Sequence, residues 1–172
     1  MEYPEVRGTA VNEGGFAFPK ANAPLDESHN AHPANVGVLW VAIEMPIDEP
    51  ACGEKNPQGL HLSFEYSGDG ETAWTHFTPA KNHEGWAGIV HGGITAVVLD
   101  EVAAKLVHNL GIRAVTGSLD VRYIKPAMVG QQLEFRARLL RQRGRLVEVK
   151  AEARCENGAL VATATAVMFK VE

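Results

Sequence analysis

The chain of 172 residues has few cysteines and no long apolar run. Its two cysteines, Cys52 and Cys155, stand far apart and lack the spacing of metal ligands. The sequence therefore predicts neither a disulfide framework nor a zinc site, and it fits a reducing cytoplasm. Because no stretch of about 18 or more apolar residues is present, no membrane span is expected. The acidic start, MEYPEVRGTAVNEGG, has neither the apolar segment of a secretory signal nor the arginines of a transit peptide.

Positive charge is scarce in the first 111 residues. They hold 5 lysines and arginines against 15 aspartates and glutamates, whereas residues 112–172 hold 11 against 6. The cations between Arg136 and Arg154 fit two interpretations: a solvated outer face of a sheet, or a site for an anionic tail such as a nucleotide phosphate. The net charge of −5 and the lack of a basic patch interleaved with aromatics disfavour nucleic acid as a partner.

Regular periodicity is missing from residues 1–35, which are rich in Pro, Gly, Asn and Ala and predict an extended or partly disordered arm. The apolar stretch at 36–45 fits either a strand or a helix. His29 and His32 have no cysteine or acidic partner at coordinating spacing, so no metal site is expected. We expect an N-terminal extension over residues 1–51 and one folded domain over residues 52–172.

Apolar alternation predicts strands on both sides of one helix. The helix is expected over 92–109, ending at Asn109-Leu110-Gly111. Turn residues predict hairpins at SGDG, at RQRGR (141–145) and at ENGA (156–159), and Asn157-Gly158 is typical of a type I′ turn. The segment 81–88 reads as a glycine-containing loop. Strands are expected at residues 60–67, 71–79, 115–126, 132–140, 145–155 and 160–171.

The predicted helix is apolar around most of its circumference, so other structure must wrap it. Four strands follow it in sequence, and their alternation leaves one half-polar sheet face. We therefore expect an α+β fold in which four sequential antiparallel strands help a sheet to curl around the helix. Alternating Ala and Thr at 162–166 would let the helix approach closely.

Three motifs give the chain a recognisable pattern. The first is Glu84-Gly85-x-x-Gly88-x-x-His91-Gly92-Gly93, with Asp100 nine residues after the histidine. The others are Thr116-x-x-Leu119-x-Val121-x-Tyr123-x-x-Pro126 and Cys52-Gly53-x-x-Asn56-Pro57-x-Gly59-Leu60. On these motifs, residues 52–171 resemble the hotdog-fold acyl-coenzyme A thioesterases, in the subgroup of phenylacetate-pathway and long-chain acyl-CoA thioesterases. Some of these relatives carry an asparagine where this chain has Gly85, so no asparagine role is carried over.

The resemblance implies a hotdog fold and hydrolysis of acyl-CoA thioesters to free acid and CoA. It implies no cofactor, since CoA enters as part of the substrate, and a homodimer or a dimer of dimers. The acyl group is left open. Two other functions stay in view: a hotdog protein that binds or senses acyl-CoA without turnover, and a hydratase, whose closely spaced Asp and His pair is not found.

Gly92 and Gly93 stand at the start of the expected helix, where unpaired N–H groups and the helix dipole favour negative charge. The Gly92 N–H could therefore polarise a thioester carbonyl, or the two glycines could merely allow close packing. Asp100 lies in an apolar helix, where a carboxyl tends to have a raised pKa. It fits a general base, a nucleophile, or a structural residue bonded to buried backbone.

Distance along the helix adds a constraint. Residues 93 and 100 are about 10 Å apart at roughly 1.5 Å per residue, too far to act on one carbonyl. Two antiparallel helices side by side would bring the start of one to Asp100 of the other, which predicts sites shared across a homodimer.

The remaining candidate site residues are less specific. His91 fits a bond to backbone in the preceding loop or a contact with the thioester. The resemblance implies that Thr116 holds the attacking water, although a strand threonine pairing with a neighbour fits equally. Trp86 could wall the acyl pocket or anchor its loop, and Glu101 fits a salt bridge with Lys105. The expected substrate-binding residues are Gly93, Glu84, Gly85, Trp86 and Gly88.

Overall fold

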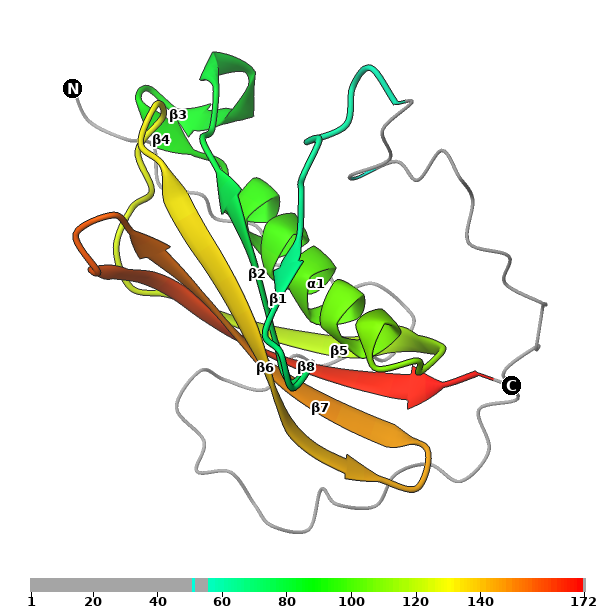
Figure 1. Ribbon diagram of the computed structural model, residues 1–172. Coiled ribbons are helices and arrows are strands. Elements are labelled where there is room, and N and C mark those ends of the chain that lie inside the picture. Colours follow the sequence, from blue (N-terminus) through cyan, green and yellow to red (C-terminus); the bar gives the residue numbers. More distant parts are fainter. Residues whose placement is uncertain (1–50, 52–55, 172) are drawn as a thin grey trace, which may run out of the picture. The chain divides into compact units, whose positions relative to one another are not determined.

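The computed structural model describes residue 51 and residues 56–171. These residues form a curved six-stranded antiparallel sheet, in the order β1-β2-β6-β7-β8-β5, and one long helix (Figure 1). A separate hairpin of β3 and β4 precedes the helix. The elements are β1 (Glu65–Tyr66), β2 (Thr72–Phe77), η2 (Lys81–His83), β3 (Glu84–Trp86), β4 (Ile89–Val90), α1 (Gly92–Asn109), β5 (Ala114–Tyr123), β6 (Leu133–Arg143), β7 (Leu146–Cys155) and β8 (Leu160–Lys170).

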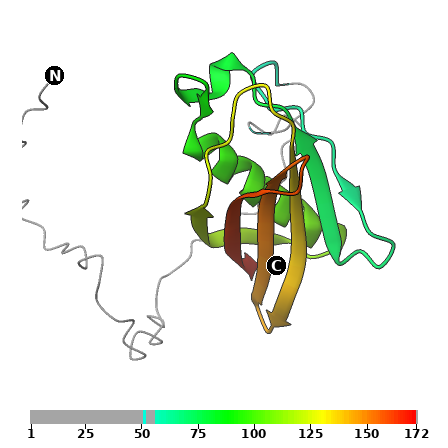
Figure 2. The ribbon, with the colours of Figure 1, turned by 90° about the vertical axis from the view of Figure 1, so that its left-hand side faces the viewer.

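Helix α1 has the predicted bounds and lies along one face of the sheet, which bends around it (Figure 2). It ends because Gly111 takes a positive φ of 73°, a conformation that glycine adopts without strain. The Gly111 N–H donates to the His108 carbonyl at 2.9 Å. Within the described part of the chain, no helix is both long and apolar enough to cross a bilayer.

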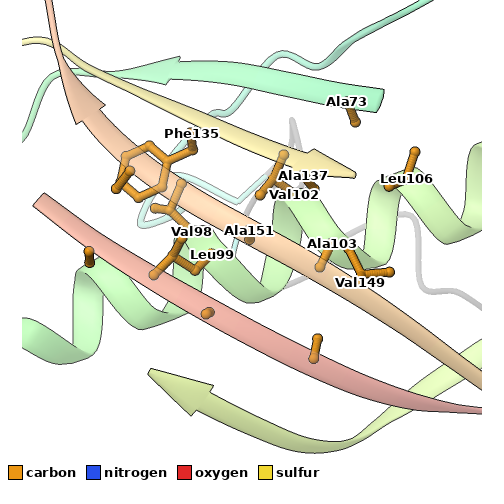
Figure 3. Close-up of a cluster of buried hydrophobic side chains, with 14 of the residues drawn as sticks. Ala73, Val98, Leu99, Val102, Ala103, Leu106, Phe135, Ala137, Val149 and Ala151 are labelled. Atoms are coloured by element: carbon orange, nitrogen blue, oxygen red, sulfur yellow. The ribbon is translucent and has the colours of Figure 1, made fainter. Parts of the chain in front are cut away.

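The core lies between α1 and the concave face of the sheet (Figure 3). Helix residues Val98, Leu99, Val102, Ala103 and Leu106 are fully buried. Small side chains face them from the sheet, so the helix axis can approach the strands closely, as the alternation at 162–166 predicted. The buried alanines on the strands are Ala73, Ala137, Ala151, Ala153, Ala162, Ala164 and Ala166. This is the hotdog architecture.

The strands after the helix follow the predicted alternation, with small shifts at their ends. The first predicted strand is much shorter than expected, since only Glu65–Tyr66 of 60–67 pairs with β2. The expected loop at 81–88 is also more ordered than predicted: it contains η2 and the start of the β3–β4 hairpin. Leu60, Leu62 and Phe64 pack with the core outside any strand, although their alternation is typical of one, and Glu84–Trp86 pairs with the nearby Ile89–Val90.

Strand order is the main correction to the predicted fold. β6, β7 and β8 do pair in sequence, but β5 pairs with β8 at the sheet edge and β2 pairs with β6. The turn at 156–159 is also not type I′, because that turn needs a positive φ at Asn157 and only Gly158 has one, at 79°. The Gly158 N–H donates to the Cys155 carbonyl at 2.8 Å, and the adjoining ladder carries a bulge.

Four of the cations between Arg136 and Arg154 are paired with acids on the outer face of β6 and β7. Arg136 Nε lies 3.1 Å from Glu134, and Arg154 Nη2 lies 2.7 Å from Glu152. Arg141 pairs with Glu148 and Lys150 with Glu152. These pairs favour the solvated-face interpretation over an anion site. The arm at 1–35, the stretch 36–45, His29, His32 and Cys52 lie outside the described residues.

Candidate active site

Asp100 lies on the third turn of α1 and faces the start of β5. Its Oδ1 accepts a hydrogen bond from the Thr116 hydroxyl at 2.9 Å. Burial raises the pKa of the Asp100 carboxyl above its usual value, and the bond from Thr116 offsets part of that rise. The structure thus brings together two of the predicted catalytic residues, sixteen positions apart in the chain.

A bulge in β5 places Thr116 beside the helix. Thr116 pairs with Met168 and Ser118 with Val167, so Gly117 is an extra residue between them. Met168 is buried under the helix, and Thr116 shares its face of the sheet. Regular alternation from Leu119 would have put Thr116 on the outer face. A side chain on Gly117 would overlap the Phe169 ring, so the bulged position has room only for glycine.

His91 is the N-cap of α1. Its Nδ1 accepts the Gly93 N–H at 2.9 Å, and its backbone N–H donates to the His83 carbonyl in the preceding loop at 2.8 Å. The histidine therefore bonds the loop and caps the helix, while its side chain is exposed. Because His91 occupies the Gly93 N–H, that group is not available to a substrate oxygen in this conformation.

The Gly92 N–H makes no hydrogen bond with any described residue. Its carbonyl accepts the Tyr123 hydroxyl at 2.7 Å. A side chain on Gly92 would lie 3.3 Å from the Tyr123 ring and hydroxyl, so glycine lets the two elements meet. Tyr123 was not among the predicted site residues, although its place in the Tyr-x-x-Pro motif was the available signal.

The predicted substrate-binding residues of the loop support the helix start. Glu84 Oε1 accepts the Gly88 N–H at 3.1 Å and closes the β3–β4 turn. Gly85 lies against the His91 backbone, where a Cβ would come within 2.9 Å. Trp86 is 81% exposed. Contact of these residues with a substrate stays a prediction.

A hollow of about 300 Å³ opens beside the helix start. We call it the Gly92 hollow. Its walls come from β4, from the first turn of α1, from the end of β5 with the loop that follows, and from β8. The wall residues include Ile89, Val90, Gly92, Tyr123, Ile124 and Val161.

Asp100 and Gly92 are not brought together within one chain. They are eight residues apart on the same straight element, about 12 Å at 1.5 Å per residue. Among the described residues there is also no group of three or more His, Cys, Asp or Glu side chains able to hold a metal ion.

Known proteins are similar to this chain in sequence and in fold. Residues 87–162, which run from the β3–β4 turn to the start of β8, match the sequence model of the thioesterase superfamily. Over these residues, the chain is similar to that superfamily. No curated protein sequence matches the chain.

Solved structures share the fold. One is a thioesterase superfamily protein with a TM-score of 0.66 and 24% identity, aligned over 69% of this chain and 61% of its own. The chain thus spans less than two thirds of that protein. A second is a thioesterase-related protein of phenylacetic acid degradation from Ralstonia eutropha, with a TM-score of 0.59 and 29% identity over 65% of this chain and 86% of its own.

A third similar structure is a thioesterase protein from Streptococcus pneumoniae with coenzyme A. It has a TM-score of 0.60 and 20% identity, over 64% of this chain and 85% of its own. Two further structures are variants of a thioesterase protein from the same strain, in which an aspartate and a threonine are each replaced by alanine. Those two positions are sixteen apart, the same separation as Asp100 and Thr116.

Proposed function

We propose that the protein hydrolyses acyl-CoA thioesters to a free acid and coenzyme A. The observation that carries this proposal is the Asp100–Thr116 pair, a half-buried carboxyl bonded to a hydroxyl at 2.9 Å in a thioesterase superfamily domain. A carboxyl whose pKa is raised by burial is suited to accept a proton from water or to attack a carbonyl. The aspartate and threonine chosen for replacement in the pneumococcal relative have the same separation, which supports the assignment.

In the general-base form of the reaction, Asp100 takes a proton from water as the water oxygen bonds to the thioester carbon. The Thr116 hydroxyl donates its hydrogen bond to Asp100, so the Thr116 oxygen can still accept a hydrogen bond from that water. The carbonyl oxygen becomes negative and is stabilised by the Gly92 N–H and the dipole of α1. Collapse of the intermediate breaks the C–S bond, and the CoA thiolate takes up the proton that Asp100 removed from water as the acid is released. In the nucleophilic form, the Asp100 carboxylate attacks the thioester carbon, CoA thiolate leaves as the C–S bond breaks, and water hydrolyses the resulting anhydride to the free acid and Asp100.

The two halves of this site are about 12 Å apart in one chain, so we propose that they work across a homodimer. The Gly92 N–H of one copy and Asp100 of the other would meet when two α1 helices lie antiparallel and adjacent. The coenzyme A in the pneumococcal structure supports an acyl-CoA substrate rather than another thioester.

The test is hydrolysis of an acyl-CoA panel, with release of free thiol as the readout. The wild type should hydrolyse at least one member, and Asp100→Asn should lower kcat about 100-fold to 10,000-fold, the usual contribution of a general base. Glu101→Gln, which removes the adjacent carboxyl, is the matched control and should retain activity. Tight binding of acyl-CoA without any turnover would contradict the proposed hydrolase and favour a protein that binds acyl-CoA without hydrolysing it.

A further inference from the structure

We propose that the Gly92 hollow is the acyl subsite, that it takes a compact apolar acyl group such as a short branched chain or a single aryl ring, and that the Tyr123 ring sets its size. The proposal rests on the proposed function, since it assumes a thioester at the Gly92 N–H.

The position of the hollow follows from the carbonyl that Gly92 would bind. An oxygen held by the Gly92 N–H lies about 2.9 Å from that nitrogen. Gly92 itself lines the hollow. The carbonyl carbon, one bond further on, carries two substituents, the acyl chain and the sulfur. One of these must enter the hollow and the other must leave it.

The walls favour the acyl chain over the pantetheine arm. Most of the lining side chains are apolar, among them Ile89, Val90 and Val161, and the polar ones besides Tyr123 are Thr95 and Lys125. The Tyr123 hydroxyl is already given to Gly92. A pantetheine arm carries two amides, and burying an amide without hydrogen-bond partners is costly. An acyl chain has no such requirement.

Backbone groups around the hollow are also paired. The N–H groups of Ile124 and Lys125 donate to the Val161 carbonyl at 2.8 and 3.1 Å, and the Val90 N–H donates to the Ala127 carbonyl at 2.9 Å. These bonds close the wall as a small extension of the sheet. They leave few backbone groups for an amide of the ligand, which again favours an apolar occupant.

The size of the hollow restricts the acyl group. At about 300 Å³ it is at the lower end of the range of small-molecule sites, about 300 to 1,000 Å³. A single ring or a short branched chain fits this space, whereas a long unbranched chain would extend past Tyr123 into solvent. Tyr123 is 52% exposed, and its hydroxyl bond to the Gly92 carbonyl holds the ring in the wall.

The experiment compares kcat/KM for acetyl-, isobutyryl-, benzoyl-, octanoyl- and palmitoyl-CoA. The wild type should prefer isobutyryl- or benzoyl-CoA over palmitoyl-CoA by about tenfold or more, the usual scale for a pocket that gains or loses one group. Tyr123→Ala should raise kcat/KM for octanoyl-CoA relative to isobutyryl-CoA by about tenfold. Tyr123→Phe keeps the ring and should preserve the wild-type order of substrates. A wild type that prefers palmitoyl-CoA, or an unchanged order in Tyr123→Ala, overturns the proposal.

A second variant protects the test against a folding defect in the first. Ile124 lines the hollow and is 46% exposed, so Ile124→Trp should fold and narrow the space. Benzoyl-CoA should then lose about tenfold more in kcat/KM than acetyl-CoA does. Equal losses on both substrates would contradict an acyl subsite here.

Binding of unreactive thioethers separates this proposal from the proposed function. Calorimetry with free CoA, S-isobutyl-CoA and S-decyl-CoA should show tighter binding of S-isobutyl-CoA than of either other ligand. Tyr123→Ala should lower that preference and leave free CoA unchanged. If no acyl-CoA is hydrolysed but this binding preference is found, the proposed hydrolytic function is contradicted and the proposed acyl subsite is supported. If Tyr123→Ala weakens the binding of free CoA, the hollow holds the pantetheine arm and the proposed acyl subsite is contradicted.

Discussion

At the scale of single residues, the first peptide groups of α1 have separate tasks. The Gly93 N–H is taken by the His91 ring, and the Gly92 carbonyl by the Tyr123 hydroxyl. The peptide between Gly92 and Gly93 is therefore held on both sides. The neighbouring Gly92 N–H is left for a ligand, which narrows the predicted glycine pair to one donor.

Replacing Gly92 tests that donor directly. Gly92 is the first helical residue, where proline is tolerated, and the φ of −59° and ψ of 129° at His91 suit a residue before proline. Both Gly92→Pro and Gly92→Ala add a Cβ that faces Tyr123. Only Gly92→Pro also removes the N–H. We expect Gly92→Pro to have about 100-fold to 1,000-fold lower kcat than Gly92→Ala. Equal kcat values in the two variants would exclude the Gly92 N–H as oxyanion donor.

Thr116 should set the acidic limb of the pH profile. Its hydrogen bond lowers the pKa of Asp100 against the effect of burial. Thr116→Val removes the bond, so the pKa of Asp100 rises and the loss of kcat/KM on acidification begins at a higher pH. Thr116→Ser keeps the hydroxyl and should keep the wild-type limb. An acidic limb that does not move in Thr116→Val would show that Asp100 is not the group that titrates.

At the scale of elements, regular patterns were predictable and interruptions were not. The alternation in β6 and β7 and the apolar circumference of α1 reflect burial of each side chain, which sequence records directly. The β5 bulge depends on how Gly117 meets Phe169, 52 residues away, and no local pattern encodes that contact. The apolar alternation of β5 therefore could not predict that Thr116 faces Asp100.

The contact between Gly117 and Phe169 should be measurable as coupling. Gly117 does not have a positive φ, so it is required for space rather than for conformation. Gly117→Ala should lower the free energy of unfolding by about 1 to 3 kcal/mol, as for other overpacked sites. In a Phe169→Ala background the same change should cost much less. Denaturant titration of the four proteins completes the cycle, and additive costs would mean that the cost of Gly117→Ala does not come from the Phe169 ring.

At the scale of the whole molecule, the distance between Asp100 and Gly92 could be predicted from helix geometry alone. The order of strands in the sheet could not be predicted in this way. β5 lies next to β8 because of the path of the connecting loops, and the sequences of the two strands do not reveal that path. The candidate site inherits both facts. Its aspartate and threonine meet within one chain, while the oxyanion donor is proposed to come from a second copy.

Complementation between two inactive variants tests the shared site. Asp100→Asn and Gly92→Pro are co-expressed with different tags, and mixed dimers are isolated through both tags. One of the two sites in a mixed dimer then has an intact Gly92 from one chain and an intact Asp100 from the other. We expect about half of the wild-type activity. Mixed dimers as inactive as the parent variants would place the whole site within one chain.

The half-buried position of Asp100 has a consequence for heat resistance. Its pKa is raised in the folded protein, so its contribution to stability is greatest below the ordinary aspartate pKa and is lost as pH rises through the folded-state value. At neutral pH the ionised carboxyl therefore works against the fold, and Asp100→Asn should melt at a higher temperature than the wild type. The gain should shrink in melts at progressively lower pH. Selection for thermal stability alone would then favour replacement of this aspartate, which is the trade-off expected of a residue with the proposed catalytic role.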